Sequence, residues 1–204
     1  MIDRIVYTID QVSKSVGHAF AWCIIVLTLG TSYEVFMRYL LNNPTSWAFD
    51  MSYILYGGLF LMAGPYALSR NAHVRGDVIY RLWPERTQGW IELVLYFIFF
   101  FPGVVSLMFA GLGYGYEAFK LREVSVNSPA GVPVWPLKML IPIAGALLTL
   151  QGIAEVLRCI QCIRTGKWPA RLHDVEELET AIAAEAAAQR AREAAEQAAA
   201  GGAR

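Results

Sequence analysis

Four long apolar segments set the strongest limit on what this chain of 204 residues can fold into. They cover residues 17–37, 47–68, 93–116 and 135–157. Each segment reaches the roughly 20 residues that a helix needs to cross about 30 Å of hydrocarbon. A buried helix of a soluble protein is rarely apolar on every face over such a length. The sequence therefore predicts an all-α membrane protein with four transmembrane helices in a lipid bilayer.

The composition supports this class of protein. Charged residues make up 17% of the chain, against about 25% in soluble domains. The formal net charge is zero, so the charge balance gives no argument for a nucleic-acid partner. Residues 1–16 are polar with scattered charges, and the apolar run that follows them is too long for a secretory signal. We expect that run to be retained as the first membrane helix.

Lysine and arginine predict the orientation. With four spans, both termini and the loop between the second and third spans lie on one side of the membrane. That side holds ten lysines and arginines even when the three most distal arginines of the tail are left out. The opposite side holds Arg38, Lys120, Arg122 and Lys138. Because positive charge stays cytoplasmic, both termini are expected inside the cell.

Two segments outside the spans also have helical patterns. Val78, Ile79, Leu82 and Trp83 repeat at helical spacing before Pro84, which predicts a short interfacial helix between the second and third spans. Alanine occupies 12 of the 20 positions 181–200, which favours a cytoplasmic helical tail. An apolar heptad begins there but is not sustained, so a solvated single helix is favoured over a partner-binding coiled coil. We divide the chain into a membrane domain, 1–165, and a tail, 166–204.

Polar residues near the outer ends of the first two spans are candidates for structural or partner contacts. Glu34 and Arg38 are four residues apart, so they can pair on one helix face or contact a partner. Asp50 lies in the first turn of the second span, where the helix dipole favours an acid. Thr45 or Ser46 can cap that helix.

The fourth span carries a second polar pair, and the third span a glycine motif. Gln151 and Glu155 are four residues apart near the inner end of the fourth span. They can contact a partner helix, or Glu155 can pair locally with Arg158. Gly111 and Gly115 form a G-x-x-x-G pattern, which permits close contact between helices.

Signatures of catalysis are not found in the sequence. His18, His73 and His173 fall at or beyond the predicted span boundaries, which does not support a haem held by two histidines within the bundle. Cys159 and Cys162 form a C-x-x-C, but it lies in a continuous helical pattern without a second cysteine pair, so we interpret both as ordinary helix residues. We expect neither an enzyme nor a cofactor in this chain.

The segment from Arg38 to Leu82 resembles a known family, the DctQ-like small membrane subunit of tripartite ATP-independent periplasmic (TRAP) transporters. The resemblance rests on an Arg-Tyr that closes the first span, a Trp followed three residues later by an acid, and a His-Val-Arg-x-Asp after the second span. The matching positions are Arg38, Tyr39, Trp47, Asp50, His73, Arg75 and Asp77. Family members usually have Glu where this chain has Asp50. Residues 127–155 resemble one subgroup through a Pro-x-Trp-Pro that contains Trp135.

The resemblance implies a complex in the bacterial inner membrane. Family members pair with a large multi-span permease that holds the substrate and sodium sites, and a periplasmic binding protein delivers the solute, usually an organic acid. The small subunit supports the permease, and its cytoplasmic turn would hold His73, Arg75 and Asp77. The residues expected at partner interfaces or in structural motifs are Glu34, Arg38, Tyr39, Trp47, Asp50, His73, Arg75, Asp77, Trp135, Gln151 and Glu155.

Two alternatives remain at the level of sequence. A standalone four-helix carrier needs an acid deep in the membrane, and Glu34 lies too near the boundary to suit it. A membrane anchor subunit of a redox enzyme would need intramembrane histidines, or chemistry at Cys159 and Cys162.

Overall fold

The computed structural model describes residues 2–71, 80, 82–169, 184–186 and 189–190. Within these residues the fold is all α, and a single β-bridge joins Val124 to Pro133. The elements are the helices α1 (Ile2–Tyr39), α2 (Ala48–Ser69), α4 (Glu85–Leu95), α5 (Phe101–Lys120) and α6 (Trp135–Thr165), with the π-helical turn η1 (Tyr96–Phe100) between α4 and α5.

The prediction of four membrane helices is confirmed. α1, α2, α6 and the continuous run Glu85–Lys120 are each long and apolar enough to cross a membrane. Three of the four, namely α1, the run Glu85–Lys120 and α6, extend well beyond the predicted apolar segments. The residues that flank those segments are more polar but are still helical. α1, with 38 residues, is about 57 Å long, nearly twice the hydrocarbon thickness.

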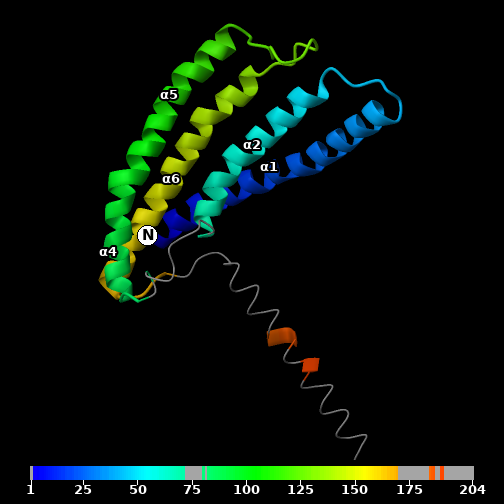
Figure 1. Cartoon of the computed structure of the whole chain (residues 1–204). Coiled ribbons are helices and arrows are strands. Elements are labelled where there is room, and N and C mark those ends of the chain that lie inside the picture. The colour runs from blue at the N-terminus through cyan, green and yellow to red at the C-terminus, as the bar shows by residue number, and fades with distance from the viewer. Residues whose placement is uncertain (1, 72–79, 81, 170–183, 187–188, 191–204) are drawn as a thin grey trace, which may run out of the picture.

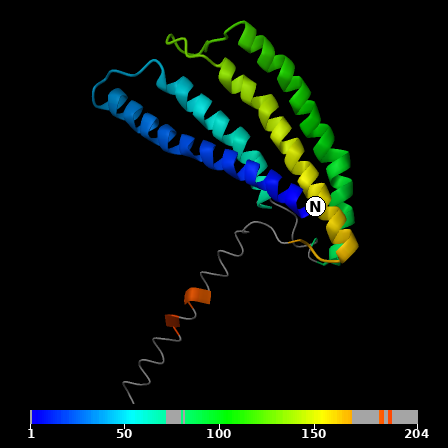
Figure 2. The same ribbon diagram turned by 180° about the vertical axis from the view of Figure 1, so that it is seen from behind.

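The helices form two hairpins that lie side by side, with α6 in contact with α1, α2, α4 and α5 (Figure 1). We call the end with Ile2, Ser69, Glu85 and Thr165 the N end, and the end with the connections 40–47 and 121–134 the loop end. α1 runs at an angle to α5 and α6 and approaches α6 towards the N end, as the view from behind also shows (Figure 2).

Close backbone approach defines the contact between α5 and α6. Pro142 of α6 has no amide hydrogen, which frees the carbonyl of Lys138 from its helical bond. A Cβ added to Gly115 would lie 3.1 Å from that carbonyl oxygen, and one added to Gly111 would lie 3.1 Å from the Pro142 nitrogen. The close contact predicted from the G-x-x-x-G pattern is therefore confirmed, and it lies inside this chain.

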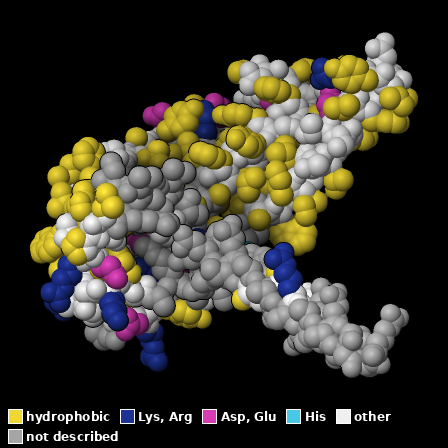
Figure 3. Space-filling view, turned by 60° about the horizontal axis from the view of Figure 1, so that its bottom comes forward, with side chains coloured by type: hydrophobic (Ala, Val, Ile, Leu, Met, Phe, Trp, Pro, Cys, Tyr) yellow, Lys and Arg dark blue, Asp and Glu magenta, His cyan; other side chains and the backbone are white. Residues whose placement is uncertain are grey.

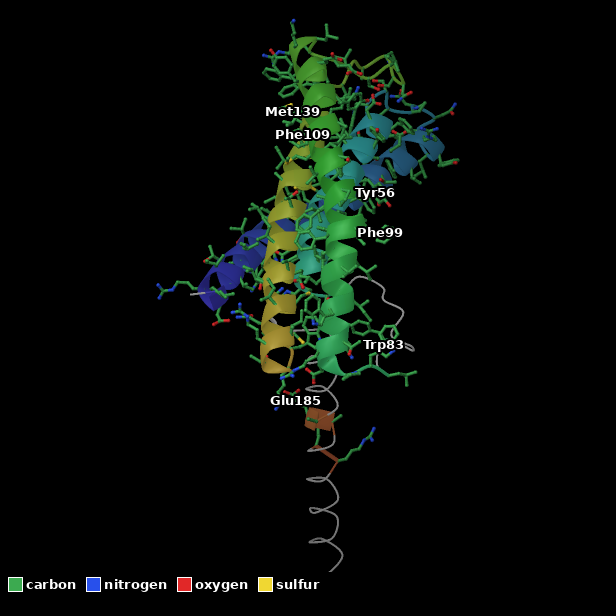
Figure 4. All side chains as sticks on the ribbon, turned by 90° about the vertical axis from the view of Figure 1, so that its left-hand side faces the viewer. Tyr56, Trp83, Phe99, Phe109, Met139 and Glu185 are labelled. Carbon is green, nitrogen blue, oxygen red and sulfur yellow. The ribbon has the colours of Figure 1, made fainter. Side chains whose placement is uncertain are left out.

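Exposed large apolar side chains cover much of α1, α2 and α5, and many apolar side chains are visible on the face shown in Figure 3. None of the residues in the most apolar stretch of α1 is buried. Large aromatic side chains such as Tyr56 of α2 and Phe99 and Phe109, before and within α5, are exposed, and they are labelled in Figure 4. This surface fits lipid or other apolar membrane helices better than water.

Parts of two predictions fall outside the described residues. Of the predicted interfacial helix, Val78 and Ile79 lie outside, so this helix stays a prediction. In the tail, residues 184–186 and 189–190 are helical, and the other residues from 170 onwards lie outside the described part of the chain.

Candidate functional site

Five polar side chains meet between the two hairpins near the N end, and we call them the N-end cluster. Its members are Asp10 and Ser13 of α1 and Gln151, Glu155 and Arg158 of α6, none of them more than 3% exposed. Spacings of three and four residues place each set on one face of its helix. Each helix therefore presents its polar set to the other.

Hydrogen bonds connect the N-end cluster across the two helices. Arg158 donates from Nη1 to Glu155 Oε1 and from Nη2 to Asp10 Oδ2. The Gln151 amide donates to Asp10 Oδ1 over 2.8 Å. The Ser13 hydroxyl donates to Gln151 Oε1, also over 2.8 Å. The two buried carboxylates thus share the Arg158 guanidinium, and each accepts a hydrogen bond from it, which lowers the free-energy penalty of burying them.

The cluster decides between the two interpretations of Gln151 and Glu155. Glu155 pairs with Arg158, as the spacing predicts, and the Gln151 side chain bonds to α1 of the same chain. Asp10 and Ser13 were missed by the sequence reasoning. The signal available in the sequence was the spacing of Val6, Asp10 and Ser13, which places them on one helix face of the polar segment before the first span. In the structure all three residues are buried.

At the loop end, Asp50 holds the connection 121–134 against the start of α2. Its carboxylate accepts from the Ser125 hydroxyl over 2.6 Å and from the Ser128 hydroxyl, and the side chain is buried. The predicted cap of α2 was wrong, since no side chain caps this helix. Thr45 instead turns back to Glu34.

Glu34 binds the other connection of the loop end, 40–47. Its Oε1 accepts from Arg38 Nη2 over 2.6 Å, which confirms the predicted ion pair. Its Oε2 accepts from the amide of Thr45 over 3.0 Å and from the Thr45 hydroxyl. Nearby, the ring of Trp47 stacks on Tyr33 with centroids 6.3 Å apart, whereas Tyr39 is exposed.

Trp135 begins α6 and packs against the end of α5. Its ring forms a T-shaped contact with Phe119, with centroids 5.2 Å apart, and the Arg122 guanidinium lies 5.4 Å from the Trp135 ring centroid and 4.7 Å from the Phe119 ring centroid. Lys138 donates to both carboxylate oxygens of Glu123 over 2.6 Å. These contacts surround the first turn of α6 at the loop end.

The C-x-x-C pair lies in the contact between α4 and α6. Cys159 and Cys162 are fully buried and are not joined in a disulfide. The Cys159 thiol lies 3.8 Å from Glu92 Oε2, and the Cys162 thiol lies 3.4 Å from the carbonyl oxygen of Glu85. Among the described residues, no group of three or more His, Cys, Asp or Glu is arranged to hold a metal ion.

Three residues of the family pattern stay untested. His73, Arg75 and Asp77 lie outside the described residues, so their expected place in the turn after the second span remains a prediction.

Fold and polar contacts together define a multi-pass membrane protein whose internal charges join its own helices. The chain belongs to the DctQ family: the model described as "Tripartite ATP-independent periplasmic transporters, DctQ component" matches residues 27–162, about two thirds of the chain. No curated protein matches the chain. The matched region includes the α6 members of the N-end cluster but begins after Asp10 and Ser13.

Proposed function

We propose that this chain is the small membrane subunit of a TRAP transporter, where it scaffolds a large permease subunit. The permease would carry out sodium-coupled uptake of an organic acid that a periplasmic binding protein delivers. The family match over the four-helix core is the observation that carries this proposal.

The distribution of charge and apolar surface supports a scaffold role. Asp10, Glu155 and Arg158 bond to one another, and Asp50 bonds to the connection 121–134, so these polar groups hold the subunit together. The apolar outer faces of α1 and α5 remain as surface for lipid and for the permease. We place the substrate and sodium sites on the permease.

Orientation follows from the basic residues. The N end carries the excess of lysine and arginine, so we place it and both termini in the cytoplasm of a bacterium, with the chain in the inner membrane. The loop end, with connections 40–47 and 121–134, then faces the periplasm, where it can contact the binding protein.

Co-purification tests the scaffold proposal. A tagged copy of this chain, expressed with the large TRAP permease subunit from the same organism, should retain the permease through detergent extraction and size exclusion. A tagged unrelated four-helix membrane protein serves as the control. Failure to retain the permease, under conditions in which each protein is folded, would contradict the proposal.

A further inference from the structure

The polar contacts that join α1 to α6 are confined to the N end. Within the described residues they involve positions 3–13 of α1 and 151–161 of α6, and they include a 2.7 Å bond from the Gln161 amide to Asp3 Oδ1. Further along, α1 packs on α2, where a Cβ added to Gly17 would lie 2.6 Å from Tyr66 Cβ. Gly57, Gly58 and Gly64 of α2 pack against leucines of α6, whereas the polar bonds between α1 and α6 lie only at the N end. The docking of α1 on α6 therefore depends on a short polar contact.

We propose that the N-end cluster is a conformational device that fixes how the first hairpin docks on the second. In this view the start of α1, which precedes the family match, is a structural part of the subunit that closes the N end of the bundle. The ion pair between Asp10 and Arg158 is its central contact.

The membrane environment makes this polar contact important for helix association. Apolar side chains gain little from leaving lipid for another helix, so helix association there relies on close packing and on polar bonds. Glu155 can hold Arg158 within α6 whether or not α1 is docked, because the two are three residues apart on one helix. Asp10 reaches Arg158 and Gln151 only when α1 lies on α6. The Asp10 bonds therefore report whether α1 is docked on α6.

The cluster also selects one register. Ser13 bonds to Gln151, while Gln151 and Arg158 both bond to Asp10. A slip of α1 by one helical turn, about 5.4 Å, would break all three bonds at once and take the Asp10 carboxylate away from Arg158 and Gln151. Such all-or-none satisfaction is what lets a buried polar set specify one arrangement of helices.

Cross-linking in the full-length chain tests this device. The substitutions Asp3→Cys and Gln161→Cys place thiols on two residues that are hydrogen-bonded across α1 and α6 at the surface of the N end. Cys23→Ala removes the partly exposed native thiol, and Cys159 and Cys162 are buried. The protein is reconstituted in lipid nanodiscs and treated with a short bis-maleimide.

In this background, Arg158→Met should lower the cross-linking yield by roughly tenfold, because it removes the cation and leaves the two carboxylates together. Arg164→Met is the matched control: it removes an exposed arginine from the same helix and should leave the yield unchanged. An unchanged yield in Arg158→Met, with normal helix content by circular dichroism, would overturn the proposal.

Asp10→Asn keeps the test decisive if Arg158→Met does not accumulate. It removes one charge while it preserves the shape of the side chain, and it should lower the yield in the same direction by a smaller factor. A yield equal to that of the parent would count against the device. The readout needs no large subunit, so it is independent of the proposed transport role.

Discussion

Individual carboxylates join separate segments of this molecule. Asp10 joins the start of α1 to α6, Glu34 joins the end of α1 to Thr45, and Asp50 joins α2 to the connection 121–134. An ionised carboxylate can accept several hydrogen bonds at once, and bonds to charged acceptors are stronger than neutral ones. These three residues are therefore the positions where a single substitution should have the largest effect on local structure.

Asp50→Ala should loosen the loop end. The substitution leaves the hydroxyls of Ser125 and Ser128 without their acceptor, and hydrogen bonds to charged groups contribute about 1.5–3 kcal/mol each. We expect a loss of about 2–3 kcal/mol in denaturant unfolding, together with faster proteolysis within 121–134. Glu117→Ala, which removes an exposed carboxylate of α5, is the control. Equal stability of the two variants would show that the Asp50 bonds do not hold the connection.

Glu34 and Arg38 should differ in importance although they form one ion pair. Arg38 is 54% exposed, and exposed ion pairs contribute only about 0–1 kcal/mol. Glu34 is mostly buried and also holds Thr45. We expect Arg38→Ala to leave the unfolding free energy nearly unchanged and Glu34→Ala to lower it measurably, because Glu34 also accepts both Thr45 bonds. A larger loss for Arg38→Ala than for Glu34→Ala would contradict this assignment.

At the scale of the elements, the contact between α5 and α6 makes a prediction with an internal control. Gly115→Ala would bring a methyl group within 3.1 Å of the Lys138 carbonyl oxygen, whereas nothing lies within 4 Å of a Cβ at Gly113. We expect Gly115→Ala to destabilise the protein by about 1–3 kcal/mol, as overpacking does. Gly113→Ala should be neutral or stabilising, because alanine favours helix over glycine. Unfolding in a detergent titration measures both, and equal effects would exclude a close contact at Gly115.

The helices themselves were largely predictable, whereas their ends and contacts were not. Apolar length alone predicts four spans, but α1 begins at Ile2 rather than near residue 17, because its polar first turns pack on α6 instead of ending the helix. The π-helical turn η1 just before Pro102 has no signal in apolar periodicity.

The polar contacts within one helix were predictable, whereas those between distant segments were not. The pairs Glu34–Arg38 and Glu155–Arg158 were predictable, because residues three or four apart meet on one helix face. The bonds from Arg158 to Asp10 and from Ser125 to Asp50 join residues 148 and 75 positions apart. Such contacts depend on how the hairpins dock, which a single sequence does not specify.

At the scale of the whole molecule, the two ends of the bundle should lie on opposite sides of the membrane. A cysteine at the fully exposed position Val126, in the connection 121–134, should react with an impermeant maleimide in intact spheroplasts. A cysteine at Arg164, near the end of α6, should react only after permeabilisation. The opposite pattern would reverse the orientation inferred from the basic residues.

The apolar exterior and the internally paired charges fit the proposed role of a subunit that supports transport by another protein. Substrate uptake in proteoliposomes tests this most directly, with a sodium gradient, the periplasmic binding protein and candidate organic acids. The account predicts that vesicles with this chain and the large permease accumulate substrate, and that vesicles with this chain alone do not. Accumulation by this chain alone, or by the permease equally well without it, would contradict the account.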